Sequence, residues 1–313
     1  MSPSLPDIIQ RLSDLSGSEL NTLLLQVFDN QVNKITPPQL LKLYQTNRFV
    51  HPSGSDMIGL LKLEATTLEL LQTNGFQPIE LSPAAQLGSC AVVATASQKK
   101  ILSATRNTEI TADATNALAL HIADLKSSGK ASNKATGNQR LPAGEIYHFC
   151  TVHRHIRTQE LKGRGFTAHF KVGCLVSSGR DTGSYEFECT QLLQHLRTLD
   201  HLFRNAYAIT NIRFKLQRRD GYDNRNPLLA RLLDHIHRHA PDLNVSGEEP
   251  AVANNYYKGI QFKMIIPFHD NEIEIADGGF VDWTQQLLGN KKERLLISGF
   301  GLELLYKLQS GLL

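Results

Sequence analysis

Apolar residues recur at helical spacing through the first 50 residues of the chain. Leucine, isoleucine, valine and phenylalanine follow one another at this spacing across 5–30, and Ser16-Gly17-Ser18 separates two short helices. Thr36-Pro37-Pro38 begins a third helix, because proline in a first turn lacks only an N–H that has no partner there. The pattern predicts a helical N-terminal extension over residues 1–55.

Helical and alternating patterns follow each other through the rest of the chain. Residues 56–75 form an amphipathic helix that ends at Asn74-Gly75, and 76–81 has the pattern of a strand. Further strands are predicted at 145–152, 166–176, 207–216, 256–266, 272–276 and 294–299, and further helices at about 185–204, at 226–239 and from about 301. Hairpin strands mixed with helices predict an α+β fold, with a mostly antiparallel sheet flanked by helices.

Residues 126–144 interrupt this pattern. The stretch is rich in glycine, serine, asparagine and lysine, and almost none of its side chains could pack in a core. We predict a mobile loop at this point, inside a core domain that covers residues 56–313.

Composition favours a globular protein and excludes several classes. With 313 residues and 41% hydrophobic content, the chain can bury a sizeable core. No apolar run reaches the roughly 18 residues of a membrane-spanning helix, and the start lacks the regions of a signal peptide; we expect no membrane partner and a cytoplasmic location. A net charge of +3 is too small to imply nucleic-acid binding. The four cysteines lack metal-ligand spacing, which predicts reduced, mostly buried thiols.

The last third of the chain carries a recognisable order of motifs. Tyr256-Tyr257-x-Gly259-Ile260-x-Phe262 is followed by Ala276-Asp277-Gly278-Gly279 and then by Ile297-Ser298-Gly299-Phe300-Gly301-Leu302-Glu303. This order resembles the second half of a histidyl-tRNA synthetase catalytic core, and residues 57–312 can be laid along that core. The resemblance implies a class II synthetase-like fold without the anticodon-binding domain, so we do not expect tRNA as a partner. The regulatory subunit of ATP phosphoribosyltransferase, which resembles the synthetase without aminoacylating tRNA, is the nearest analogue in type.

The resemblance also assigns ligand-binding residues. Asp113 and Thr115 stand where the family holds the ammonium group of its substrate. His153-Arg154-His155-Ile156-Arg157 resembles the second motif, whose first arginine binds the α-phosphate of ATP; this implies a pocket role for Arg154 and Arg157. The residues expected to shape the pocket are Tyr256, Tyr257, Gly278 and Gly279, the glycines by letting backbone approach a ligand closely.

Aliphatic residues occupy several functional positions of the family. Ile156 replaces the glutamate that grips adenine, and Val172 and Leu175 replace the pair that reads histidine. Val252 and Leu304 replace two arginines, one that assists adenylation and one that stacks on adenine. Losing one well-placed electrostatic group typically costs about two to three orders of magnitude in rate. We therefore expect negligible histidyl-adenylate formation and assign no catalytic residue.

Simpler explanations of the same residues stay open. Asp113 and Thr115 could cap the helix that follows them, and Arg154 and Arg157 could be strand-pairing charges at the surface. His153 and His155 would share one face of a strand, but no acid or cysteine completes a zinc ligand set, so we predict no metal site.

The functional interpretation is a histidyl-tRNA synthetase paralogue that is not a synthetase. It would bind an amino-acid-like small molecule or a nucleotide, with ATP or another nucleotide near Arg154, or regulate a partner enzyme. Helix 57–74 and strand 76–81 resemble the family's first motif, which builds its dimer interface, and so imply a homodimer. Two alternatives remain: an ATP-dependent ligase that activates another carboxylate, and an interaction protein with a vestigial pocket.

Overall fold

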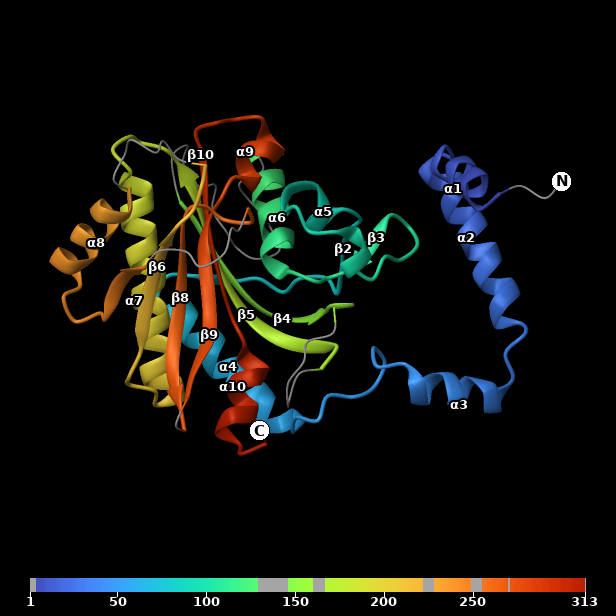
Figure 1. Cartoon of the computed structure of the whole chain (residues 1–313), viewed down its shortest axis with the longest axis horizontal. Helices are drawn as coiled ribbons and strands as arrows, with labels where there is room; N and C mark the ends of the chain where they lie inside the picture. Colours follow the sequence, from blue (N-terminus) through green and yellow to red (C-terminus); the bar gives the residue numbers. More distant parts are fainter. Residues whose placement is uncertain are drawn as a thin grey trace.

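The computed structural model describes residues 4–128, 146–159, 167–221, 228–248, 255–269 and 271–312. Its fold is α+β, as predicted, with a large and mostly antiparallel sheet flanked by helices (Figure 1). The helices are α1 (Leu5–Ser13), α2 (Gly17–Val32), α3 (Pro37–Thr46), α4 (Met57–Thr73), α5 (Ser89–Val93), α6 (Ala114–Ser128), α7 (Glu186–Tyr207), α8 (Leu228–His239), α9 (Trp283–Leu288) and α10 (Leu302–Gln309), with a 3-10 turn at Gln98–Lys100. The strands are β1 (Gln77–Pro78), β2 (Ala84–Gln86), β3 (Thr108–Ile110), β4 (Tyr147–Ile156), β5 (His169–Arg180), β6 (Arg213–Arg218), β7 (Val245–Glu248), β8 (Lys258–Phe268), β9 (Asn271–Val281) and β10 (Glu293–Phe300).

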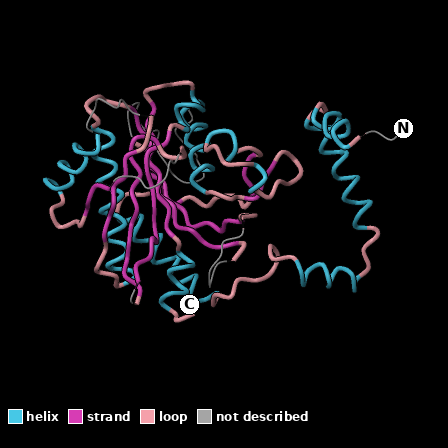
Figure 2. The backbone as a smooth tube through the Cα atoms, in the orientation of Figure 1, coloured by secondary structure: helices cyan, strands magenta, loops and turns pink. Residues whose placement is uncertain are grey.

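The main sheet has the strand order β1-β4-β5-β10-β9-β8-β6-β7 among the described residues, and β2 pairs with β3 in a separate small sheet. The strands from β4 to β6 in this order pair antiparallel, whereas β1 and β7 at the two edges pair parallel to their neighbours. Figure 2 shows the long central strands passing through the middle of the body, with helices on either side.

Two hydrophobic cores lie on the two faces of this sheet. Helices α4, α7, α8 and α10 cover the first core, and α5, α6 and α9 cover the second. Adjacent strand residues alternate between the cores, so that Leu175 packs into the first and Val176 into the second, and both are fully buried. Because strand parity selects the face, a shift of one residue in the sequence alignment moves a side chain to the opposite side of the sheet.

Several predicted boundaries differ from the structure. Helix α7 continues to Tyr207, because Leu199, Phe203 and Tyr207 extend its buried face, and strand β6 begins at Arg213 instead of 207. Strand β9 runs on to Val281 instead of ending at 276, because the glycines inside it pair with β10.

The predicted mobile loop at 126–144 begins too early. Helix α6 extends to Ser128, and Lys126 at its end forms an ion pair with Glu293 at an N–O distance of 2.5 Å. Residues 129–144 lie outside the described residues. Within the described part of the chain, no helix is both long and apolar enough to cross a bilayer.

The first three helices form an arm beside the body. Figure 1 shows α1, α2 and α3 standing apart from the sheet, and none of their side chains is buried. Each helix begins with a capping box, at Ser4, Ser16 and Thr36, which satisfies N–H groups at its start. The Arg106 N–H of the body donates a 2.8 Å hydrogen bond to the Asn21 side chain, which attaches the arm near β3.

Candidate functional site

A cavity of about 480 Å³ opens on the face of the sheet that carries α5 and α6. Its wall is built from the ends of β4, β5, β9 and β10, from the segment before α6 and from Tyr256 and Tyr257. Five of the sequence-predicted site residues line it: Asp113, Thr115, Arg157, Tyr256 and Tyr257. A volume of this size accommodates a small metabolite.

Asp113 is held by three donors at the start of α6. The Tyr256 hydroxyl donates to Asp113 Oδ2 at 2.6 Å, and the Thr115 N–H and hydroxyl donate to Oδ1 at 3.0 and 2.7 Å. Burial alone would raise the pKa of Asp113, but His155, Arg157 and these donors together lower it below its usual value. The carboxylate therefore caps the helix, as the simpler explanation has it, while it also lines the cavity.

Asp277 and Tyr257 form a second acid–tyrosine pair beside the first. The Tyr257 hydroxyl donates to Asp277 Oδ2 at 2.9 Å, and the Gln261 amide donates to the same oxygen at 3.4 Å. The rings of Tyr256 and Tyr257 meet edge to face with centroids 4.9 Å apart, which places the two pairs side by side. Burial raises the pKa of Asp277. The sequence contains Asp277 in the Ala276-Asp277-Gly278-Gly279 motif, but Glu272 and Glu274 lie on the same strand, so no sequence signal distinguished this acid.

Positive charge lies at the mouth of the cavity. Arg157 is exposed, donates from Nε to the Ala112 carbonyl at 3.1 Å and stacks over Phe170 with its guanidinium carbon 5.6 Å from the ring centroid. This contact fixes the direction of the fork, which suits a carboxylate or phosphate. Lys100 is also exposed and lines the same cavity.

His155 contributes a neutral ring to the wall. Its Nε2 accepts a 3.0 Å hydrogen bond from the Ala114 N–H, so the proton of the neutral ring is on Nδ1. Burial lowers the pKa of His155 to about 3, with the Asp113 carboxylate opposing this shift. The ring therefore supports the start of α6 without adding charge.

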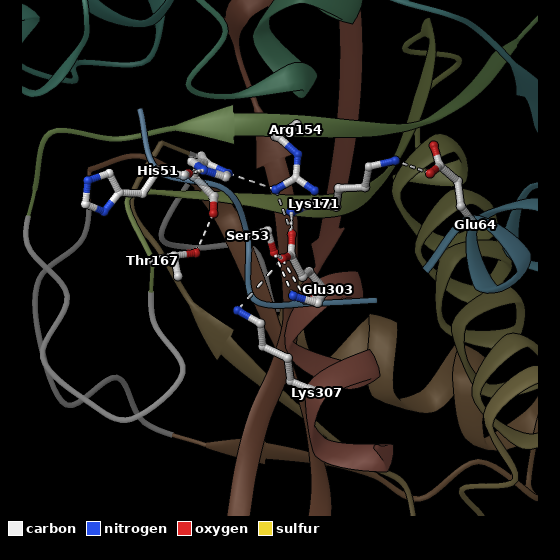
Figure 3. A network of polar contacts seen from close by, with 10 residues as sticks. His51, Ser53, Glu64, Arg154, Thr167, Lys171, Glu303 and Lys307 are labelled. Atoms are coloured by element: carbon white, nitrogen blue, oxygen red, sulfur yellow. Dashed lines mark hydrogen bonds and ion pairs between the residues drawn. The ribbon is translucent and has the colours of Figure 1, made fainter. Parts of the chain in front are cut away.

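Arg154 lies on the other face of the sheet, away from the cavity. Its Nη1 donates to Glu303 Oε2 at 2.9 Å, a pair that Figure 3 shows, and it contacts His169 Nδ1 at 2.9 Å. Glu303 is fully buried and also accepts from the Ser53 and Ser55 hydroxyls and from the Lys171 N–H. Strand parity explains the difference from expectation: residue 155 of β4 and residue 157, just beyond the end of the strand, face the cavity, while 154 faces α10.

The aliphatic replacements noted in the sequence do not all belong to the cavity. Ile156 and Leu304 do not line it among the described residues, and Leu175 is buried in the first core. Val172 does line it. Val252 lies outside the described residues. Strand parity turns Ile156 of β4 away from this cavity, and Leu304 lies on α10, packed against the first core, so neither residue lines the cavity where a nucleotide-pocket role was expected.

Gly278 and Gly279 serve packing of the sheet and not the cavity wall. A side chain at Gly278 would place Cβ 2.5 Å from the Ile297 carbonyl oxygen, and one at Gly279 would place it 2.5 Å from the Ile260 carbonyl oxygen. The ring of Tyr257 would lie 2.7 Å from a Cβ at Gly279. The backbone thus approaches neighbouring strands and Tyr257, where a ligand was expected.

Metal-binding and nucleophilic groups add little to the cavity. In the part of the chain that the structure describes, no three His, Cys, Asp or Glu side chains gather as a metal-ligand set. The His153 and His155 rings lie 6.0 Å apart, and both are buried. Burial raises the pKa of Cys174 well above its usual value, so this thiol stays protonated and packs as a small apolar group.

Comparison with known proteins identifies the fold. No protein-family model matches the sequence, and no curated protein matches it. Histidyl-tRNA synthetase from S. aureus superposes with a TM-score of 0.61 at 10% identity, covering 83% of this chain and 70% of that one. An ATP phosphoribosyltransferase regulatory subunit/histidyl-tRNA synthetase from Bacillus halodurans gives 0.59 at 12% identity, covering 83% of each chain. Histidyl-tRNA synthetase from a Nostoc species gives 0.57 at 14% identity, covering 85% and 75%. The chain therefore has the class II synthetase-like fold that these proteins share.

Proposed function

We propose that the cavity binds a small amine-bearing molecule of the amino-acid type, and that the protein acts through this binding and not as a synthetase. The observation that carries the proposal is the half-buried Asp113 carboxylate at the cavity wall, whose pKa His155, Arg157 and three hydrogen-bond donors hold below its usual value. Among the described residues Arg157 acts on this carboxylate from beyond ion-pair distance, so an ammonium group of a ligand would form its direct ion pair.

The distribution of charge supports a zwitterionic ligand. Acids lie on the cavity wall, and the exposed cations Arg157 and Lys100 lie at its mouth. A molecule with an ammonium group directed at Asp113 and a carboxylate or phosphate directed at Arg157 matches both ends. A nucleotide phosphate would bind at Arg157, because Arg154 is engaged by Glu303 on the opposite face.

Titration calorimetry with the twenty amino acids, simple amines and ATP tests the proposal. We expect at least one amine-bearing compound to bind, and Asp113→Asn to abolish that binding. Asp124→Asn is the matched control, because it removes the same group from an exposed position on α6. Failure of every compound to bind the wild-type protein would refute the proposal.

An ATP-dependent ligase is the second candidate. It is favoured by one observation: Ile156 and Leu304 lie away from the cavity, while Arg157 and Lys100 line it. Pyrophosphate exchange measured across a panel of carboxylic acids separates the candidates, since a ligase must exchange with some substrate and a binding protein with none. Exchange that Arg157→Met abolishes would favour the ligase.

We also propose a homodimer, a regulatory role toward a partner enzyme and a cytoplasmic location. A homodimer would use the start of α4, where Met57, Ile58 and Leu61 are exposed apolar side chains on a helix of the body. Light scattering of the wild type and of Ile58→Asp tests this.

A regulatory role toward a partner enzyme is supported by the regulatory subunit among the structural neighbours. The four buried free cysteines suit a reducing compartment such as the cytoplasm.

A further inference from the structure

Asp277, like Asp113, has no ion-pair partner within 4.0 Å among the described residues, in contrast to the third acid of the cavity, Glu274. Glu274, on the same strand, is paired with Lys263 at 2.7 Å. Asp277 Oδ2 accepts from Tyr257 and Gln261, which are neutral donors, and among the described residues its Oδ1 has no hydrogen-bond partner. A carboxylate in this environment is costly to ionise unless a cation joins it.

Aromatic rings complete the surroundings of this carboxylate. Tyr256, Tyr257 and Phe170 line the same cavity as Asp277. The faces of aromatic rings attract cations, and an acid beside them adds a direct counter-charge. Acid and rings together form a site for an ammonium or guanidinium group.

We infer that Asp277 binds a second cationic group of the ligand, so that the ligand class is an amino acid with a cationic side chain or a diamine. The inference rests on the proposed function, in which Asp113 takes the first ammonium group. Asp113 and Asp277 each hold a tyrosine hydroxyl, and the two tyrosine rings are 4.9 Å apart, so one small molecule can contact both carboxylates. An Asp at this position thereby distinguishes a basic side chain from a neutral one of equal length.

Calorimetry with matched pairs of compounds tests the inference. Lysine is compared with norleucine, which lacks only the side-chain amine, and arginine with citrulline. We expect the cationic member of at least one pair to bind about 10-fold more tightly or better. Cadaverine, a diamine without a carboxylate, shows whether Arg157 and Lys100 contribute to the same ligand.

Variants locate the effect at Asp277. Asp277→Asn keeps the shape and should weaken binding of the cationic compound by about 10- to 100-fold while leaving its neutral partner unchanged. Glu272→Gln removes a charge from the same strand at an exposed site paired with Arg213, and should change neither. Tyr257→Phe, which removes the hydroxyl bonded to Asp277, serves as the second variant if Asp277→Asn does not fold, and should weaken the cationic compound selectively.

The amine-binding function and the role of Asp277 are refuted by different results. Equal binding of lysine and norleucine, lost in Asp113→Asn but not in Asp277→Asn, overturns the assignment of Asp277 and leaves the amine-binding function standing. Absence of binding by every amine overturns both.

Discussion

Acidification should destabilise the fold through His155, and the size of the effect follows from the structure. In the folded chain the His155 ring is 1% exposed and accepts the Ala114 N–H, and its pKa is about 3 against 6.5 for an unperturbed histidine. Its contribution to stability is complete above the unfolded pKa and is lost as pH falls from there toward the folded one. Each pH unit in that window removes about 1.4 kcal/mol, so a fall from about pH 7 to about pH 5 costs about 2 kcal/mol through this residue.

Urea denaturation of the wild type and of His155→Gln at both pH values measures the loss of unfolding free energy that is due to His155. The glutamine amide oxygen can accept the Ala114 N–H but takes up no proton, so the variant should lose about 2 kcal/mol less than the wild type on acidification. His237→Gln, at an exposed position on α8, should lose as much as the wild type. Equal acid losses in His155→Gln and in the wild type would show that the buried ring is not the group that senses acid. His195, fully buried between the Ser177 and Ser298 hydroxyls with its pKa lowered by burial, adds a loss of the same sign to all three proteins.

Three further predictions concern stability. Gly278→Ala should lower the free energy of unfolding by about 2 kcal/mol or more, because its Cβ would clash with backbone, whereas Gly54→Ala, with nothing within 4 Å, should change it little in the same urea titration. Removing residues 1–46 should leave the melting temperature of the body unchanged within about 2 °C, because α1–α3 contribute no buried side chain; a large drop in a calorimetric scan would contradict this. Glu303→Leu should cost about 3 kcal/mol by leaving Arg154 without its carboxylate, and the double variant with Arg154→Leu should recover part of that loss; no recovery would mean that the ion pair is not the cause.

Local patterns predicted most of the secondary structure, because periodicity and helix caps act over a few residues. The amphipathic spacing after Asp56 and the Asn74-Gly75 stop gave α4 almost to the residue. Tertiary contacts decided the cases that failed. Helix α7 extends beyond its predicted end because Tyr207 packs in the first core. The Tyr207 hydroxyl also shares a hydrogen bond with the hydroxyl of Thr67, a residue 140 positions earlier.

The candidate site was predicted less completely, because it depends on which face of the sheet each strand residue points to and on which side chains form ion pairs. The motif alignment favoured Arg154 as the phosphate ligand, but alternation along β4 turns that side chain toward Glu303 and leaves Arg157 at the cavity. The sequence could not reveal that Lys263 neutralises Glu274 while Asp277 stays unpaired among the described residues, because those pairings depend on the register of β8 against β9. Asp113, Thr115 and the two tyrosines come together at one cavity, yet they belong to segments more than 140 residues apart.

The contacts of Glu303 have a consequence for how the protein is made. Ser53 and Glu303 are separated by 250 positions, so the corner they form cannot close until α10 has left the ribosome. Until α10 is synthesised, Arg154 cannot form its ion pair with Glu303. Ser53, in the segment that joins the arm to the body, cannot form its hydrogen bond with Glu303 either. Folding of this corner is therefore a late, long-range event.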